Sequence, residues 1–204
     1  MRRIHFSIYI FCLSAILVLV GCGDDDGPSG PDADVQEVVQ EGWDCFVDAD
    51  YQAALEFFTR AIEQDPTHSD AHNGAGWSSG RIPGGLSQAS DYFSRSYSLD
   101  TTRYDALGGW SFVVYQMGDW ETTLSKADSL LRRRPVWKFL HQPSVDFHDV
   151  WLIVASSNCH LGHYDRALEI IKDYLNSSFD ADVNTAMGRR EILNEIERLG
   201  RIYG

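Results

Sequence analysis

One amphipathic helical pattern occurs three times in this chain of 204 residues, and it constrains the fold more than any other feature. The copies read DADYQAALEFFTRAIEQDP at 48–66, MGDWETTLSKADSLLRRRP at 117–135 and LGHYDRALEIIKDYLNSSF at 161–179. Each copy has an aromatic residue after a turn, then small or apolar residues at matching places. Each also follows another helical stretch, so the repeating unit is a pair of helices with a period of about 34 residues.

The period and these residues resemble the tetratricopeptide repeat (TPR), whose motif places small residues, aromatic residues and a proline at fixed positions. Residues 35–68 carry the whole motif, at Gly42, Tyr51, Ala54, Phe58, Ala61 and Pro66. Residues 104–137 carry it at Ser111, Gly118, Trp120, Thr123, Ala127, Leu130 and Pro135. Residues 148–181 lack the proline but have Ala155, Gly162, Tyr164, Ala167, Ile171 and Tyr174. Residues 69–103 are the weakest copy, with Gly76, Ala89 and Phe93, and residues 138–147 form an insert.

The resemblance implies an all-α, right-handed solenoid of about four helical hairpins over residues 35–181. Small side chains on the first helix, such as Gly42 and Ala155, would meet small ones on the second, such as Ala54 and Ala167. A single hairpin leaves an apolar face uncovered, so hairpins stack in a row. Aromatic residues would fill the space between neighbouring hairpins: Tyr51, Phe58, Trp120 and Tyr164. Residues 182–204 have apolar residues at helical spacing, which predicts a capping helix.

Residues 1–21 have the pattern of a secretory signal peptide. Arg2 and Arg3 are followed by an apolar run at 8–20, which is too short to span a membrane comfortably. The run ends in LVGC, which resembles the lipobox of bacterial lipoproteins. The resemblance implies a diacylglycerol thioether and an added acyl chain such as palmitate on Cys22, and acyl chains in this number anchor a protein durably. The alternative is an ordinary signal peptide whose cleavage site contains a cysteine.

Residues 22–34 are rich in Gly, Pro and Asp, and this composition predicts a flexible acidic linker between Cys22 and the helices. The expected location is therefore beyond the inner membrane, on a lipid anchor, with the outer membrane and periplasm as the first expectation and the side that the protein faces left open. Gly23 stands where the inner-membrane retention signal usually has aspartate, but Asp24 follows it, so the choice between inner and outer membrane stays open as well.

The charge of the chain limits its partners. Without residues 1–21 the chain has 15 basic and 30 acidic side chains, a net charge of −15. This excess of acidic residues argues against nucleic acid as a partner and favours a basic or partly apolar protein or peptide. Cys45 and Cys159 lie within helical, apolar patterns, so we expect both to be small buried residues.

The predicted first helices carry the candidate binding residues. Three aromatic residues stand at the same position of the first helix in successive repeats: Trp43, Trp77 and Phe112. In TPR proteins these first helices line a concave groove that binds peptides. Large rigid side chains make strong contacts at small entropic cost. Asp70 and Asp105 stand at another shared position of these helices. They would form an acidic rim for Lys or Arg of the partner. The alternative is that the aromatic residues are core and pack against the adjacent repeat.

Other motifs are weaker. GAGWSSG at 74–80 resembles a nucleotide-binding glycine signature, but it lies inside a predicted helix with no preceding strand. Four residues match positions of an EF-hand calcium loop: Asp180, Asp182, Asn184 and Glu191. The glycine required at position 6 of that loop is Thr185, so we expect the two aspartates to favour the start of the final helix instead, one of them as its cap. We therefore predict no metal and no cofactor.

These observations predict a membrane-anchored scaffold or assembly subunit of the bacterial cell envelope that binds a partner protein in its groove. Two alternatives stay open. One is a carbohydrate-binding surface lipoprotein that uses the same aromatic residues as stacking platforms. The other is an enzyme built around the insert, with His141, Asp146 and His148, although the sequence contains no nucleophile elbow, P-loop or catalytic dyad.

Overall fold

The computed structural model describes residues 34–203, which form helices, turns and one isolated antiparallel bridge, with no strand. The predicted signal peptide, Cys22 and the linker up to residue 33 lie outside the described residues. None of the helices within 34–203 is both long and apolar enough to cross a membrane. The helices of this range are α1 (Val35–Val47), α2 (Tyr51–Gln64), α3 (Ser69–Arg81), α4 (Leu86–Leu99), α5 (Tyr104–Met117), α6 (Trp120–Arg133), α7 (Phe147–His160), α8 (Tyr164–Ile170), the π-helical η1 (Ile171–Leu175) and α9 (Ala186–Tyr203).

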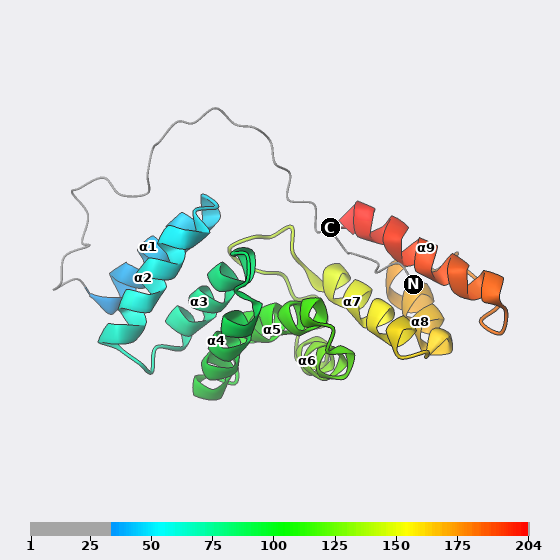
Figure 1. The fold of residues 1–204 in the computed structure, drawn as a ribbon, viewed down its shortest axis with the longest axis horizontal. Helices are drawn as coiled ribbons and strands as arrows, with labels where there is room; N and C mark the ends of the chain where they lie inside the picture. The colour runs from blue at the N-terminus through cyan, green and yellow to red at the C-terminus, as the bar shows by residue number, and fades with distance from the viewer. Residues whose placement is uncertain (1–33, 204) are drawn as a thin grey trace, which may run out of the picture.

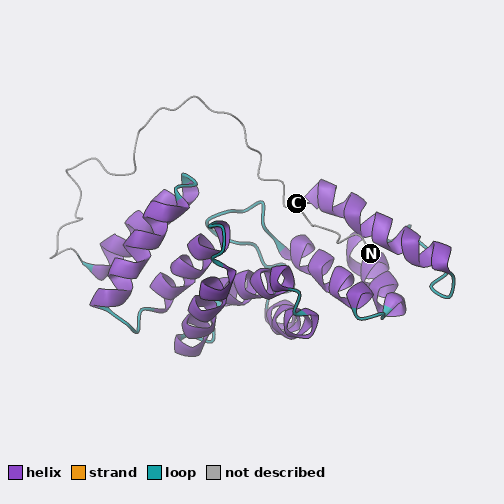
Figure 2. Ribbon diagram, in the orientation of Figure 1, coloured by secondary structure: helices purple, strands orange, loops and turns teal. Residues whose placement is uncertain are grey.

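The helices pair into hairpins, and the hairpins stack. Within the hairpins, the packed pairs are α1 with α2, α3 with α4, α5 with α6, and α7 with α8 and η1. Between hairpins, the second helix packs on the first helix of the next one: α2 on α3, α4 on α5, and α6 on α7. Figure 1 shows the hairpins following one another along an arc, with α1 and α2 at one end and α9 at the other. Figure 2 shows that the connections within and between the first three hairpins are short, whereas longer loops join α6 to α7 and η1 to α9. The predicted all-α solenoid with a terminal helix is confirmed.

The same backbone turn opens the second helix of all four hairpins. Four residues within 34–203 have positive φ angles: 63° at Ala49, 82° at Gly84, 82° at Gly118 and 83° at Gly162. Each stands two positions before its second helix, where the chain must reverse and glycine is favoured because it lacks a β-carbon. The weakest repeat therefore keeps the common turn, and Leu86 begins α4 in place of the aromatic residue found elsewhere.

Close approach between hairpins depends on glycines that face phenylalanine rings. A β-carbon added at Gly74 would lie 2.2 Å from the ring of Phe58, and one at Gly109 would lie 2.2 Å from the ring of Phe93. Both rings are buried, with 0% and 1% of their surface exposed. The GAGWSSG motif thus lies within α3 and makes room for aromatic side chains. The ring pairings are Phe58 with Gly42 and Gly74, and Phe93 with Gly76 and Gly109.

The other predicted packing residues divide into two groups. The alanines are fully buried at 0% exposure: Ala54, Ala61, Ala127, Ala155 and Ala167. The aromatic residues that begin the second helices are partly exposed: Tyr51, Trp120 and Tyr164. Tyr51 and Tyr164 pack against the core. Trp120 stacks on His160 at 4.0 Å between ring centroids. These rings therefore cover the ends of the hairpins, where the chain turns.

The last hairpin ends differently from the others. The sequence predicts a helix as far as residue 179, but regular α-helix stops at Ile170 and the π-helical η1 ends at Leu175. The amide of Asn176 donates to the carbonyl of Ile171, and its side chain donates to Glu195 of α9 at 2.7 Å. The contact with the capping helix thus ends this helix early, in a repeat that lacks the proline.

Replacing Gly74 with Ala tests the glycine–phenylalanine packing. We expect Gly74→Ala to lower the free energy of unfolding by about 1–3 kcal/mol, because Phe58 must move to admit the methyl group. Gly80→Ala in the same helix is the control. Its β-carbon would meet nothing closer than 3.5 Å, so stability should be unchanged or rise by up to about 1 kcal/mol. Urea denaturation measures both, and equal stabilities would contradict the packing argument.

Candidate functional site

The first helices of three hairpins form the face on which the sequence places the partner. Trp43 on α1 and Trp77 on α3 are buried, with 2% and 5% of their surface exposed, and Phe112 on α5 is partly buried. We call this surface of α1, α3 and α5 the inner face. In Figure 1 the loop between α6 and α7 lies along the inner side of the arc, over this face.

The loop that follows Pro135 covers the inner face as a short hairpin. The amide of Phe139 donates to the carbonyl of Val145, and the amide of Phe147 donates to the carbonyl of Trp137, each at 2.9 Å. Side chains alternate between the two sides of such an extended segment. Trp137 and Phe139 are buried at 5% and 0% exposure, whereas Leu140 is 74% exposed. We call residues 136–146 the plug.

Three inward side chains of the plug meet the three first helices in turn. The Nε1 of Trp137 donates to Asp105 on α5 at 2.7 Å. Phe139 stacks on Trp77 of α3 with ring centroids 4.0 Å apart, and His141 stacks on Trp43 of α1 at 3.7 Å. The predicted groove is therefore filled by a segment of the same chain.

The plug is also built into the helix that carries its first contact. A β-carbon added at Gly108 of α5 would lie 2.7 Å from the indole ring of Trp137. The ring of Phe112, on the same helix, lies 6.5 Å from that of Trp137. The glycine thus provides space in which the tryptophan can lie against the backbone.

The predicted acidic rim makes its contacts within the chain. Asp70 accepts a hydrogen bond from Nε1 of Trp43 at 3.1 Å and forms an ion pair with Arg103 at 3.2 Å. Burial raises the pKa of the Asp105 carboxyl, while its hydrogen bond from Trp137 acts in the opposite direction. Asp70 thus orients Trp43 of the inner face and Asp105 orients Trp137 of the plug, and their role in binding a basic partner stays a prediction.

Arg81 is the charged residue of the inner face that the sequence analysis did not single out. It lies at the C-terminal end of α3, and its Nη2 donates to the side-chain oxygen of Gln142 in the plug at 2.6 Å. Burial lowers the pKa of this guanidinium. Among residues 34–203 no carboxylate forms an ion pair with it.

The residues proposed for catalysis occupy two separate environments. His141 stacks on Trp43, and burial lowers its pKa. Asp146 and His148 form a pair at 3.0 Å between Oδ1 and Nδ1, and His148 also stacks on Tyr203 of α9. Among residues 34–203, Asp146 thus contacts His148, whereas His141 stacks on a different helix and meets neither of them. A carbohydrate would likewise find Trp43 and Trp77 covered by the plug.

The start of the final helix explains the calcium-like motif. The hydroxyl of Thr185 accepts a hydrogen bond from the amide of Gly188, so Thr185 caps α9, and the expected aspartate cap is wrong. Asp182 instead accepts from the amide of Asn184 at 3.0 Å, and Asp180 pairs with Lys172 at 3.3 Å. Within residues 34–203 no three His, Cys, Asp or Glu side chains are grouped to hold a metal ion.

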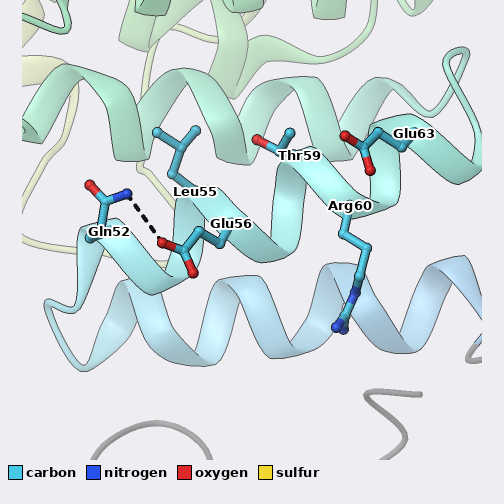
Figure 3. A pocket seen from close by; sticks show the side chains of 6 residues that line it. All are labelled: Gln52, Leu55, Glu56, Thr59, Arg60 and Glu63. Carbon is cyan, nitrogen blue, oxygen red and sulfur yellow. Dashed lines mark hydrogen bonds between the residues drawn. The ribbon is translucent and has the colours of Figure 1, made fainter. Parts of the chain in front are cut away.

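One open depression lies on the outer surface of the first hairpin. It follows a single side of α2, where Gln52 donates to Glu56 and Arg60 reaches across to Glu41 of α1 (Figure 3). Its lining is Gln52, Leu55, Glu56, Thr59, Arg60 and Glu63. These side chains come from one exposed helical stripe, so the depression is a shallow surface feature without converging chemical groups.

Comparison with known proteins supports the fold. No protein-family model matches the sequence, and no curated protein sequence matches it. A crystal structure of MamA matches 81% of this chain and 81% of its own, with a TM-score of 0.59 and 15% identity. A tetratricopeptide repeat protein from Parabacteroides merdae ATCC 43184 matches 81% of this chain and 59% of its own, with a TM-score of 0.58 and 16% identity. The chain has the TPR fold.

A second crystal structure of MamA matches 83% of this chain and 89% of its own, with a TM-score of 0.61 and 13% identity. The predicted resemblance to the TPR family is thus confirmed at the level of the fold. Sequence identities in this range carry no function from one protein to another, because one fold serves many unrelated sites.

One signal in the sequence could have revealed the plug. In VWKFLH, residues 136–141, large ring side chains stand at alternate positions, a period of two that is typical of an extended segment with one buried side. Residues 138–147 interrupt the repeat period, which predicted only an insert beside the array. Its partners on three other helices depend on the fold.

Removing the central ring of the plug should destabilise the protein. Phe139→Ala is expected to lower the free energy of unfolding by about 3 kcal/mol, because a fully buried aromatic side chain is lost. Leu140→Ala, at the neighbouring exposed position, should change it by less than about 0.5 kcal/mol. Urea unfolding followed by circular dichroism gives both values. A Phe139→Ala protein as stable as the Leu140→Ala control would show that the plug is not part of the core.

Asp149, in the first turn of α7, should make stability depend on pH. Burial raises the pKa of its carboxyl from an ordinary value near 3.8 to about 6. The folded chain therefore binds this proton more tightly than the unfolded chain, and the stability it contributes at low pH is lost as pH rises from about 4 to 6. Asp149→Asn keeps a side-chain oxygen for the amide of Asp146, which donates to Asp149 in the native protein, and removes the buried charge.

We expect the melting temperature of Asp149→Asn, relative to the native protein, to be higher at pH 7 than at pH 4. The control is Asp165→Asn, at an exposed position in the first turn of α8. Because this replacement removes no buried charge, its difference from the native protein should not shift in favour of the variant between pH 4 and pH 7. Thermal unfolding across this pH range checks the prediction, and an equal offset for Asp149→Asn at pH 4 and pH 7 would contradict it.

Proposed function

We propose that the protein is a scaffold, anchored by lipid to a membrane of the bacterial cell envelope, that holds a partner protein on the inner face of its TPR array. The acylated residue would be Cys22, and residues 23–33 would separate the folded array from the lipid surface. The docking part of the partner would be an extended segment, with the outer membrane facing the periplasm as the first expected location.

The observation that carries this proposal is the binding of an extended segment by the inner face. Trp137, Phe139 and His141 each meet a different first helix, so the face already recognises a chain that runs across α5, α3 and α1. A surface that holds its own extended segment through alternating side chains has the shape and the ring contacts to hold a similar one from a partner.

The charge distribution supports a partner with a basic surface. Residues 34–65, which form the first hairpin, contain nine acidic residues and one basic residue. This hairpin stands at one end of the arc (Figure 1). This negative charge would attract a basic partner and raise the rate of association. The close contacts of the inner face would determine the affinity.

Photo-crosslinking in the native cells tests the scaffold function. A photoreactive phenylalanine analogue at Phe112 on the inner face should give a defined adduct with a second protein. The same analogue at Glu56, on the outer side of α2, is the control and should give none. Mass spectrometry of the adduct identifies the partner, and adducts from both positions or from neither would contradict binding at the inner face.

Replacement of the predicted acylated cysteine tests the anchor. Cys22→Ser should abolish incorporation of labelled palmitate and move the protein from the membrane fraction to the soluble fraction, because no acyl chain remains to hold it. Cys12→Ser, within the apolar run of the signal, is the matched control and should leave both properties unchanged. Palmitate labelling of the Cys22→Ser protein at the native level would refute the lipid anchor.

A further inference from the structure

We infer that the plug is an internal stand-in for the partner, and that the partner's docking segment displaces it from the inner face. This segment is extended, has aromatic side chains at three alternate positions and carries a carboxylate in the place of Gln142, where it pairs with Arg81. The inference rests on the proposed function, because it identifies the chemistry of the segment that the same face binds.

One stripe of α3 provides two of the contacts that hold the plug. Asp70, Asn73, Trp77 and Arg81 are three to four residues apart, which places them on a single side of the helix. Trp77 receives the ring of Phe139, and Arg81 receives the side chain of Gln142. The stripe therefore contacts the plug at its centre, through Phe139, and near its turn, through Gln142.

The plug satisfies this stripe only in part. The indole nitrogen of Trp77 and the side-chain oxygen of Asn73 are buried and have no hydrogen-bond partner among residues 34–203. The two side chains are 5% and 1% exposed. A buried donor or acceptor without a partner costs stability, so a segment that offers a partner to either atom would bind better than the plug does.

The plug also matches Arg81 incompletely, because it offers this charged side chain a neutral partner. Its guanidinium is half-buried, burial lowers its pKa, and its neighbour in the plug is the neutral amide of Gln142. An arginine binds a carboxylate more strongly than an amide, because both partners are charged and two parallel hydrogen bonds can form. A glutamate or aspartate at this position of a partner would therefore be preferred over the glutamine of the plug.

The architecture allows the plug to leave. It meets the inner face on one side only, and Val136 and Leu140 on its other side are 76% and 74% exposed. α6 and α7, which the loop connects, pack directly against each other. The helices can therefore keep their positions when the plug moves away, and its departure exposes Trp43 and Trp77 to an incoming segment.

Peptide binding to the full-length chain tests the inference. The probes are a fluorescent peptide with the sequence of residues 135–146 and the same peptide with Gln142→Glu. We expect binding to the Phe139→Ala chain, whose plug is weakened, at least tenfold tighter than to the native chain or to the Leu140→Ala control. The Gln142→Glu peptide should bind the Phe139→Ala chain about tenfold tighter than the native peptide, and this advantage should disappear when Arg81→Gln is added.

Equal affinity of the native and Phe139→Ala chains for the peptide, or no gain from Gln142→Glu, would overturn the inference. If circular dichroism shows the Phe139→Ala chain to be unfolded, Gln142→Glu is placed in the native chain instead. Gln142→Glu should then raise the melting temperature of the chain that has Arg81 and leave that of the Arg81→Gln chain unchanged. A rise in both chains, or in neither chain, overturns the inference. These readouts need no natural partner, so they can fail while crosslinking at Phe112 still captures one.

Discussion

The close approach of phenylalanine rings to glycine backbones holds this array together. Phe58 and Phe93 each enter a space that a β-carbon on the facing first helices would fill, at Gly74 and Gly109 respectively. An array of this kind gains stability mainly from contacts between neighbouring hairpins, since no single hairpin can bury its own apolar face. The glycines weaken helix formation locally, and the burial of two aromatic rings offsets that cost.

The same packing fixes the inner face. Because each hairpin repeats the preceding one with the same left-handed turn before its second helix, α1, α3 and α5 present equivalent positions side by side. Trp43 and Trp77 thus align, and an extended segment with a side-chain period of two can meet both, through Phe139 and His141. The plug occupies the surface that these repeated helices form, and the proposed binding function rests on that occupation.

Some polar groups of the inner face are not matched by the plug. Asp105 and Asp70 have partners within the chain, whereas Trp77 and Asn73 bury atoms without one. Arg81 meets the neutral amide of Gln142 and lies over the ring of Tyr51, and no carboxylate among residues 34–203 forms an ion pair with it. Native interiors satisfy nearly all buried polar atoms. Trp77 and Asn73 are not alone on α3, because the buried hydroxyls of Ser78 and Ser79 also lack a partner among residues 34–203. For Trp77, which stacks on the plug, the proposed partner segment with different polar groups would supply the missing hydrogen bond.

The sequence by itself determined the helices, their pairing and the capping helix, because these depend on local signals such as an aspartate or a glycine at a turn and on small residues at a fixed period. It also identified Trp43, Trp77 and Phe112 as equivalent. Only the tertiary structure decided what covers them, since the contacts of Phe139 and Gln142 join residues about 60 positions apart in the chain, at Trp77 and Arg81. Periodicity reports which side of an element is apolar, but the partner of that side depends on where the whole chain places its other segments.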